Sequence, residues 1–327
     1  MDWSHFRVLV TGAGGFIGSH LAESLVDKGA LVRAMVRYNS RGLWGWLDVS
    51  DRKHDMEVIH GDVRDLDTVR EAVKGVEVVM HLASLISIPY SYAAPRSYVD
   101  TNITGTLNVL QAAREEEVDL VIHTSTSEVY GTAQYVPMDE NHPLQAQSPY
   151  AAAKIASDKL AEAFHRSFGL PVVTVRPFNT FGPRQSSRAV IPTIVSQALA
   201  KTSLELGNLS PTRDLTYVTD TAEGFVLAAE CEEAIGEVIN LGTGAEISIG
   251  NLVEKILSVM NKDLRIVCRD ERKRPEAGEV FRLCSDNSKA RDLLGWEPKT
   301  TLEHGLEMTV RWIESNIELF RPETYAK

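Results

Sequence analysis

A glycine-rich segment near the start of the chain constrains the possible folds more than any other feature. It reads TGAGGFIG at residues 11–18 and lies between an apolar run and a segment with helical periodicity. In this spacing Gly12 permits a tight turn, Gly15 lets the backbone approach a pyrophosphate, and Gly18 lets helix and strand pack closely. The amino terminus of the helix then faces the phosphate charge. We predict that the segment binds a dinucleotide through Gly12, Gly15, Phe16, Ile17 and Gly18.

Apolar runs alternate with helical patterns through the first half of the sequence. The runs occupy residues 8–10, 31–36, 58–59, 76–81, 120–123 and 172–175, and helical patterns occupy residues 17–27, 66–73 and 103–115. Strands that are apolar along their whole length are buried on both faces, as in a parallel sheet that crossover helices cover. The pattern predicts an α/β fold with a Rossmann-type doubly wound parallel sheet.

The regular alternation of apolar runs and helical patterns ends near residue 183. Shorter elements follow, with helices at 191–199, 249–260 and 302–313 and strands at 204–206 and 238–241. We therefore expect a dinucleotide-binding domain at residues 1–182, to which segments near 214–245 return, and a smaller mixed α/β lobe at residues 183–327 that binds the substrate.

Composition excludes several classes of function. The 327 residues include 34 Lys and Arg against 45 Asp and Glu, which gives a net charge of −11. Nucleic acids and anionic membranes both require a basic face, so neither is expected as a partner. The cysteines, Cys231, Cys268 and Cys284, are odd in number and lack metal-ligand spacing, which favours reduced thiols and no metal site. The chain opens without a signal-like segment and has no apolar run of ~18 residues, so we expect a cytoplasmic protein.

The end of the second predicted strand bears on the choice of cofactor. NAD-selective folds usually place an acid there, which accepts hydrogen bonds from the ribose 2′-hydroxyl. This chain instead has Arg37, followed by Ser40 and Arg41. A cation suits the 2′-phosphate of NADP, which we favour over NAD, the alternative being that both arginines are only surface residues. Asp62, after the third strand, is placed to meet the adenine amino group.

Tyr150 and Lys154 are four residues apart, so they share one face of a helix. An ammonium beside a phenol stabilises the phenolate and lowers the pKa of the phenol, which makes Tyr150 a usable base toward a hydroxyl. The YxxxK spacing is common by chance. Its weight comes from the motifs around it, among them HTSTSEVYG at residues 123–131.

Further motifs follow the glycine loop in order: HLA at 81–83, STSEVYG at 125–131, RPFN at 176–179, RDLTYV at 213–218 and LGWEP at 294–298. With the Tyr150 and Lys154 pair, they make nearly the whole chain resemble the extended short-chain dehydrogenase/reductases that act on nucleotide sugars. The resemblance implies a tightly bound nicotinamide cofactor that is regenerated in each cycle. It also implies a homodimer formed by the helix of Tyr150 and the helix that starts near residue 103.

The resemblance also implies roles for individual residues. Thr126 would hydrogen-bond the reacting sugar hydroxyl, Tyr150 would be the base, and Lys154 would lower the pKa of Tyr150 and hold the nicotinamide ribose. Asn102 corresponds to an asparagine at the active-site side. Further cofactor contacts are implied at Val63, Leu82 and Ala83, and substrate contacts at Ser127, Asn179, Val190, Leu206, Arg213 and Arg274.

A narrower resemblance rests on residues 38–40, 44–48, 88–92 and 124–131, which read YNS, WGWLD, IPYSY and TSTSEVYG. These segments are similar to the 4,6-dehydratases of the legionaminic-acid pathway, which act on nucleotide-linked N-acetylglucosamine. The nucleotide would be UDP or GDP. Such an enzyme oxidises the sugar at C4, eliminates water across C5 and C6, and returns hydride to C6.

Ser127 and Glu128 bear on which reaction follows the oxidation. Dehydratases of the deoxyhexose branch typically carry Asp-Glu at this place, where the Asp protonates the leaving hydroxyl and the Glu removes the C5 proton. A serine hydroxyl is a poor general acid at neutral pH, so either Glu128 moves the proton by itself or another acid takes part. The expected catalytic residues are Thr126, Glu128, Tyr150 and Lys154.

Other functions remain open at this point. The same Thr-Ser-Glu string occurs in nucleotide-glucuronate decarboxylases, which would need a cation at the sugar carboxylate, and Arg184, Arg188 and Arg274 are candidates. A 4-epimerase comes third, because it has no use for Glu128. A non-catalytic nucleotide-sensing regulator belongs to a different class, and such proteins commonly lose the Tyr or the Lys.

Overall fold

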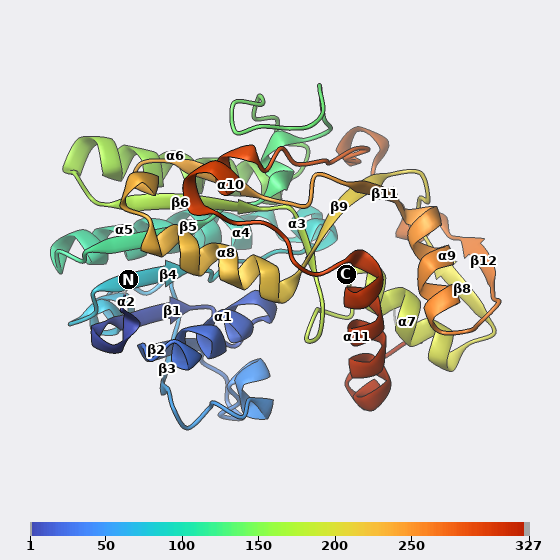
Figure 1. The fold of residues 1–327 in the computed structure, drawn as a ribbon, viewed down its shortest axis with the longest axis horizontal. Coiled ribbons are helices and arrows are strands. Elements are labelled where there is room, and N and C mark those ends of the chain that lie inside the picture. The colour runs from blue at the N-terminus through green and yellow to red at the C-terminus, as the bar shows by residue number, and fades with distance from the viewer. Residues whose placement is uncertain (1, 324–327) are drawn as a thin grey trace.

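The structure, a computed structural model, describes residues 2–323 and has two lobes that stand side by side (Figure 1). The larger lobe contains a seven-stranded sheet in the order β10-β6-β5-β4-β1-β2-β3, in which every neighbouring pair is parallel. Its strands are β1 (Arg7–Thr11), β2 (Leu31–Arg37), β3 (Glu57–Gly61), β4 (Val78–His81), β5 (Leu120–Thr124), β6 (Val172–Pro177) and β10 (Val238–Leu241). The predicted Rossmann-type α/β fold is confirmed.

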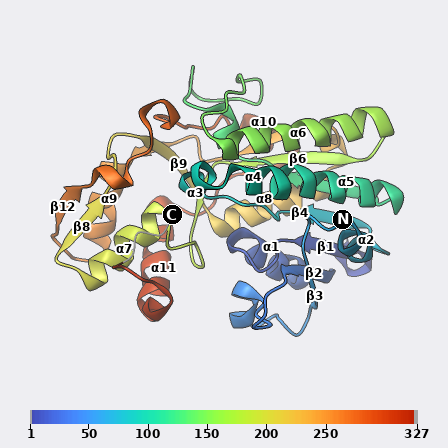
Figure 2. The same cartoon turned by 180° about the vertical axis from the view of Figure 1, so that it is seen from behind.

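Helices cover both faces of this sheet. One face is covered by α1 (Phe16–Asp27), α8 (Val218–Glu230) and α10 (Ser288–Leu294), and the other by α2 (Leu66–Val73), α5 (Gly105–Glu115) and α6 (Pro149–Phe168). Each face has its own apolar core, with Leu21, Phe225 and Trp296 on one and Leu110 and Phe164 on the other. α5 and α6 run side by side along the second face (Figure 2).

The smaller lobe is built around two short sheets. One has the order β11-β9-β7, with β7 (Asn179–Phe181), β9 (Thr212–Tyr217) and β11 (Glu246–Ser248), and the other pairs β8 (Ser203–Leu206) with β12 (Arg265–Cys268). Helices α7 (Val190–Ala200), α9 (Ile249–Val259) and α11 (Leu302–Ser315) pack with them around a separate apolar core. The short helices α3 (Ile88–Ala93) and α4 (Pro95–Tyr98) follow β4 in the chain.

The chain crosses between the lobes more than once. α8 and β10 return from the smaller lobe to the sheet of the larger one, whereas β9 stays in the smaller lobe. α10 also returns, and Trp296 beyond it donates from Nε1 to the carbonyl of Asp220 at 2.8 Å. This last return was not predicted, because residues 288–294 make a helix of only two turns.

The helix expected from residue 103 begins earlier, as a π-helical turn at Val99–Thr104 that continues into α5. This wider turn leaves the carbonyl of Asn102 able to accept from Thr106 Oγ1 at 2.6 Å and from Ser157 Oγ at 2.8 Å. α5 is thereby tied to α6. Within residues 2–323, no helix combines the length and the apolar character that crossing a membrane requires.

Candidate active site

The glycine loop joins β1 to α1 at the carboxyl edge of the sheet, where open α/β sheets bind ligands. Gly12 has a φ of +74°, and a Cβ there would lie 2.8 Å from the backbone nitrogen of Ala83. At Gly18 a Cβ would lie 2.3 Å from the carbonyl of Gly12, so only glycine allows the helix this close to the turn. Gly15 caps α1 without a side chain, which leaves the amino end of the helix open to a phosphate.

The segment after β2 covers the outside of the glycine loop. Trp46 donates its backbone N–H to the carbonyl of Gly14 at 3.0 Å. Its ring meets Trp312 of α11 edge to face, with centroids 5.4 Å apart. The aromatic segment at residues 44–48 thus closes the loop from outside and joins it to the smaller lobe.

Arg37 and Asp62 lie together at the carboxyl ends of β2 and β3. Arg37 is exposed and pairs in register with Gly61, the residue before Asp62. Hydrogen bonds from Arg64 at 2.5 and 2.9 Å, helped by the charge of Arg37, hold the pKa of Asp62 below its usual range. The Asp62 carboxylate is therefore engaged with an arginine on its own turn. Ser40 is exposed in the following loop.

The loop after β4 is fixed beside the glycine loop. Thr11 Oγ1 accepts from the backbone nitrogens of Leu82 and Ala83 at 3.1 and 3.2 Å. Asn102 clamps Leu85 by accepting from its N–H at 2.8 Å and donating to its carbonyl at 3.0 Å. Asn102 thus supports this loop from within the protein. Val63 is buried against Gly105, where a Cβ would come within 2.7 Å of its side chain.

Tyr150 and Lys154 lie on the first turns of α6 and are both buried. Burial raises the pKa of Tyr150, and the charge of Glu128 adds to this, while a hydrogen bond with Thr126 lowers it. Burial lowers the pKa of Lys154 to about 8, opposed by the charge of Asp158. Lys154 Nζ donates to the carbonyl of Thr124. The expected lowering of the Tyr150 pKa by Lys154 stays a prediction.

A buried hydrogen-bond network lies directly beneath these residues. The Asp158 carboxylate accepts from Ser125 Oγ at 2.6 Å and from Arg176 Nη2 at 2.9 Å, and meets His123 Nε2 at 3.0 Å. Arg176 Nη1 donates to Tyr130 Oη at 2.7 Å, and Tyr130 donates to Asn240 on β10. Burial alone would raise the pKa of Asp158, but the hydrogen bond with His123 and the charge of Arg176 hold it well below its usual range.

Asp158 was not predicted as a site residue, although a local signal was present in the sequence. Asp158 comes four residues after Lys154 and eight after Tyr150, so all three lie on the buried face of α6. A carboxylate on an apolar helix face needs a partner, which here is Arg176 from β6.

Glu128 lies in a cluster of alternating charges, which we call the Glu128 cluster: Glu128, Arg213, Arg274 and Glu279. Arg274 Nη1 is 3.9 Å from Glu128 Oε1 and 3.7 Å from Glu279 Oε1. Arg213 Nη2 is likewise 3.7 Å from Glu279 Oε1, while Nη1 donates to the carbonyl of Thr212 at 2.8 Å. Burial lowers the pKa of Arg213, an effect that the charge of Glu128 opposes. Nothing in the sequence pointed to Glu279.

The three arginines considered for a sugar carboxylate have different surroundings. Arg184 is held by Glu23 at 2.9 Å, and Arg188 is exposed and donates to Ser186 at 3.1 Å. Of the three, Arg274 is the one that faces Glu128. Ser127 is buried at the start of a 3-10 turn that ends at Tyr130, and Thr126 caps this turn by accepting from the N–H of Glu128 at 3.3 Å.

Several buried polar atoms in this region have no hydrogen-bond partner among the described residues. They are Thr124 Oγ1 beside Lys154, Asn179 Oδ1 at the start of β7, and Arg274 Nη1 in the Glu128 cluster. Such atoms are rare in native proteins and call for an explanation, of which a polar ligand or water is one. Together with the open amino end of α1, they fit a dinucleotide and a sugar diphosphate. Val190 and Leu206, which the resemblance implied as substrate contacts, pack with the core of the smaller lobe.

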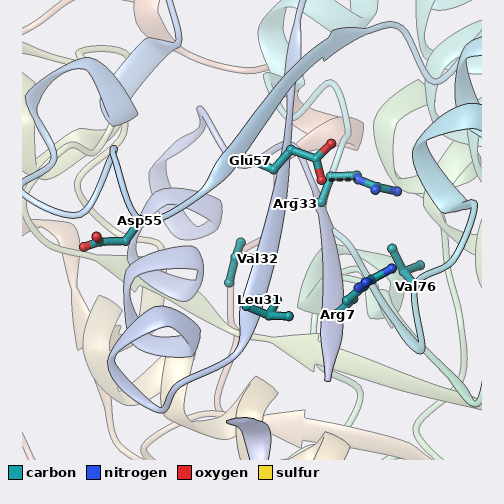
Figure 3. A pocket seen from close by; sticks show the side chains of 7 residues that line it. All are labelled: Arg7, Leu31, Val32, Arg33, Asp55, Glu57 and Val76. Atoms are coloured by element: carbon teal, nitrogen blue, oxygen red, sulfur yellow. Dashed lines mark hydrogen bonds and ion pairs between the residues drawn. The ribbon is translucent and has the colours of Figure 1, made fainter. Parts of the chain in front are cut away.

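A separate hollow lies at the opposite edge of the sheet, at the amino ends of β1 and β2 (Figure 3). Arg33 in its wall donates to Glu57 at 2.8 Å and to the carbonyl of Ala72 at 2.9 Å. Because these contacts satisfy the guanidinium and the hollow faces away from the glycine loop, we do not assign it to the site.

Comparison with known proteins identifies the family. A family model described as GDP-mannose 4,6 dehydratase matches residues 9–309. The chain belongs to this family. The motif resemblance to nucleotide-sugar dehydratases and epimerases is thereby confirmed, and the chain is an enzyme of this type.

Relatives in the family carry out different reactions. The chain is 34% identical over 315 residues to a UDP-glucose 4-epimerase of Mycolicibacterium smegmatis, covering 94% of this chain and 99% of the relative. It is 32% identical over 324 residues to a dTDP-glucose 4,6-dehydratase of Streptomyces niveus, covering 97% and 95%. The crystal structure of a dTDP-glucose 4,6-dehydratase from Streptomyces venezuelae with NAD bound matches with a TM-score of 0.88 and 31% identity, covering 97% of this chain and all of that one.

Asp158→Asn should destabilise the protein by about 3–5 kcal/mol, because it leaves the buried guanidinium of Arg176 without its counter-charge. The pKa of Asp158 in the folded state is well below its unfolded-state value of about 4. The stabilisation is therefore fully present above pH ~4 and is lost as the pH falls from there toward the folded-state pKa. Urea unfolding at pH 7 and at pH 3.5 should therefore show a smaller difference between variant and wild type at the lower pH. Asp263→Asn, at an exposed position, is the control. A difference that does not depend on pH would contradict this role.

Proposed function

We propose that the chain is a nucleotide-sugar 4,6-dehydratase that acts on UDP- or GDP-linked N-acetylglucosamine and forms a 4-keto-6-deoxy sugar. The observation that carries the proposal is the buried carboxylate of Glu128, close enough to Tyr150 for its charge to raise the Tyr150 pKa. A base at this place has a use only if a second proton, besides that of the C4 hydroxyl, leaves the sugar. Proton removal at C5 is that step.

The first half of the reaction is oxidation at C4. Tyr150 takes the proton of the C4 hydroxyl, which Thr126 orients through the hydrogen bond it shares with Tyr150. A nicotinamide dinucleotide, when bound, accepts the hydride and gives it back later in the cycle. Lys154 contributes an ammonium group beside the reacting atoms, since its pKa of about 8 leaves it mostly charged at neutral pH. Oxidation makes the C5 proton acidic, because a carbanion at C5 is then conjugated with the C4 ketone.

The second half of the reaction is elimination, and the Glu128 cluster is suited to it. Glu128 removes the C5 proton while the C6 hydroxyl leaves, and it returns the proton to C5 when hydride arrives at C6. Arg213 is buried between the lobes and supplies a fixed positive charge for the diphosphate of the substrate. Asn179, at the start of β7, is a second polar contact for the same part of the substrate, to which its side-chain Nδ2 would donate.

A glucuronate decarboxylase is the second candidate, and the charges at the site argue against it. Its substrate carboxylate would have to bind Arg274, which already faces Glu128 and Glu279. A third negative charge there is unfavourable. A simple 4-epimerase is less favoured, because it leaves Glu128 without a role. N-acetylglucosamine is supported by the resemblance of residues 88–92, which form α3 beside the site.

Product analysis of the wild-type protein is the direct test. Mass spectrometry after incubation with UDP- and GDP-linked N-acetylglucosamine, glucose and glucuronate should show loss of one water from an N-acetylglucosamine nucleotide. Loss of carbon dioxide from the glucuronate substrate would favour the decarboxylase instead. A product of unchanged mass would favour the epimerase.

We further propose a homodimer that forms through α5 and α6. The two helices lie side by side on one face of the larger lobe (Figure 2). Leu107 on α5 and Phe168 at the end of α6 are apolar and exposed there. A dimer would cover these side chains.

Tyr150→Phe removes the proton acceptor and keeps the ring. Turnover should fall at least ~10²-fold, the usual contribution of a general base, while the nucleotide sugar still binds. Turnover is followed by formation of the 4-keto product, and binding by calorimetry. Near-normal turnover would show that another group is the base.

NADP is the preferred cofactor in this proposal, because the exposed Arg37 ends β2 where NAD-selective folds place an acid. Arg37→Ala should weaken NADP binding by about 1–3 kcal/mol, the scale of a charge-assisted contact, and leave NAD binding nearly unchanged. Titration of both cofactors against both proteins measures this. Equal losses for NADP and NAD, or a native preference for NAD, would refute the phosphate-binding role.

Glu128→Gln keeps the size of the side chain and removes its basicity. Oxidation at C4 should survive, while elimination falls ~10²-fold or more. Reduced cofactor should then accumulate beside a 4-keto sugar that keeps its C6 oxygen. Exchange of the C5 hydrogen with solvent deuterium, followed by NMR, should fall in parallel. Elimination at the wild-type rate would mean that Glu128 is not the base.

A further inference from the structure

The proposed elimination needs a proton donor for the departing C6 oxygen, and the charged members of the Glu128 cluster do not supply one. Arginine does not give up its proton in proteins, so Arg213 and Arg274 act only as positive charges. Glu279 lies 3.7 Å from a guanidinium nitrogen of each of these arginines and forms an ion pair with both. Ser127 is a poor acid at neutral pH.

Tyr92 on α3 brings a phenol to this cluster. Its hydroxyl lies directly over Gly278, where a Cβ would come within 2.7 Å of Tyr92 Oη. Gly278 belongs to the short loop that carries Arg274 and Glu279, so one loop joins the phenol to the Glu128 cluster. Only a residue without a side chain at position 278 lets the ring approach this closely. Tyr92 and Gly278 are 186 positions apart in the sequence.

The electrostatic surroundings of Tyr92 suit a donor. Burial raises the pKa of Tyr92, Arg274 lowers it, and Glu128 and Glu279 raise it again. The phenol therefore keeps its proton at neutral pH, and Arg274 is placed to stabilise the phenolate that forms when the proton leaves. Tyr92 is 37% exposed, so water can restore the proton between turnovers.

We propose that Tyr92 is the general acid that protonates the C6 oxygen during elimination; this rests on the dehydratase function proposed above. The C5–H bond breaks and its proton goes to Glu128, the C6–O bond breaks, and the Tyr92 proton joins the leaving oxygen to form water. Hydride then returns to C6, and Glu128 gives its proton back to C5. Tyr150 has gained the proton of the C4 hydroxyl and Tyr92 has lost one, so exchange with solvent restores both residues.

The test is Tyr92→Phe, with Tyr90→Phe as the matched control on the same helix. Tyr90 is exposed and packs against Tyr98, with ring centroids 6.2 Å apart. Each variant is incubated with the nucleotide sugar in deuterated water. Reduced cofactor, C5 deuterium exchange and water loss are measured separately. In Tyr92→Phe, water loss should fall ~10²-fold while C4 oxidation and C5 exchange stay within about twofold of wild type. Tyr90→Phe should leave all three rates unchanged.

Each other outcome has a defined meaning. Wild-type water loss in Tyr92→Phe overturns the proposal and leaves Glu128 to move the proton alone. Equal losses in both variants overturn it too, because they place the effect in the packing of α3. Loss of C5 exchange together with water loss also overturns it, since a donor to oxygen does not act on C5. Failure of the proposed function is distinct: the wild-type protein itself would then release no 6-deoxy product from any nucleotide sugar.

Discussion

A single buried carboxylate, Asp158, holds together the parts of the molecule that would carry out the first half of the proposed reaction. It accepts hydrogen bonds from Ser125, which follows β5, and from Arg176 on β6, and its charge keeps the neighbouring Lys154 more easily protonated than burial alone would allow. Arg176 extends the network to Tyr130 and so to β10, the edge strand. Both Thr126 and Glu128 lie in the segment between Ser125 and Tyr130. Ser125 and Tyr130, which both belong to the network, therefore fix the two ends of the segment that carries Thr126 and Glu128.

The cofactor loop is coupled to the second lobe through the first helix. Ile17, in the first turn of α1, packs against the cores of both lobes. Further along α1, His20 meets the carbonyl of Pro183 at 3.1 Å, and Glu23 holds Arg184 at 2.9 Å. These contacts are made where the chain leaves the larger lobe. The helix whose amino end faces the phosphate site thus also fixes the angle at which the smaller lobe meets the glycine loop.

Local patterns predicted the sheet well, because its strands are buried on both faces. Every residue of β4 and β6 is buried and most are apolar, so the strands were recognisable even though His81 and Arg176 at their carboxyl ends are polar. β9 could not be predicted in the same way. It contains Asp214, which is fully buried and accepts hydrogen bonds from the backbone nitrogens of Thr243 and Ser285 at 2.8 and 3.0 Å. These partners follow in the chain by 29 and 71 residues, so no local pattern could reveal them.

The contrast between local patterns and long-range contacts also separates the site residues that could be predicted from those that could not. Tyr150 and Lys154 were found because helical spacing alone puts them on one face. The same spacing applied once more would have found Asp158. Tyr92 and Glu279 left no comparable signal, because each meets the Glu128 cluster only after the lobes have packed. Site residues that share one helix face can be predicted from their spacing in the sequence, whereas site residues brought together by the packing of the lobes cannot.

The two halves of the proposed reaction are therefore built by different physical means. In the proposal, oxidation at C4 uses Thr126, which follows β5, and Tyr150 and Lys154 on α6, all close to the Asp158 network inside one lobe. The residues for the later step come from α3, from the turn after β5 and from the loop at residues 274–279. Epimerases and dehydratases match this chain at 34% and 32% identity, so overall similarity does not separate them. Both need the first group of residues. We expect the charges and proton donors between the lobes to separate the reactions, because only elimination requires a base at C5 and an acid at C6.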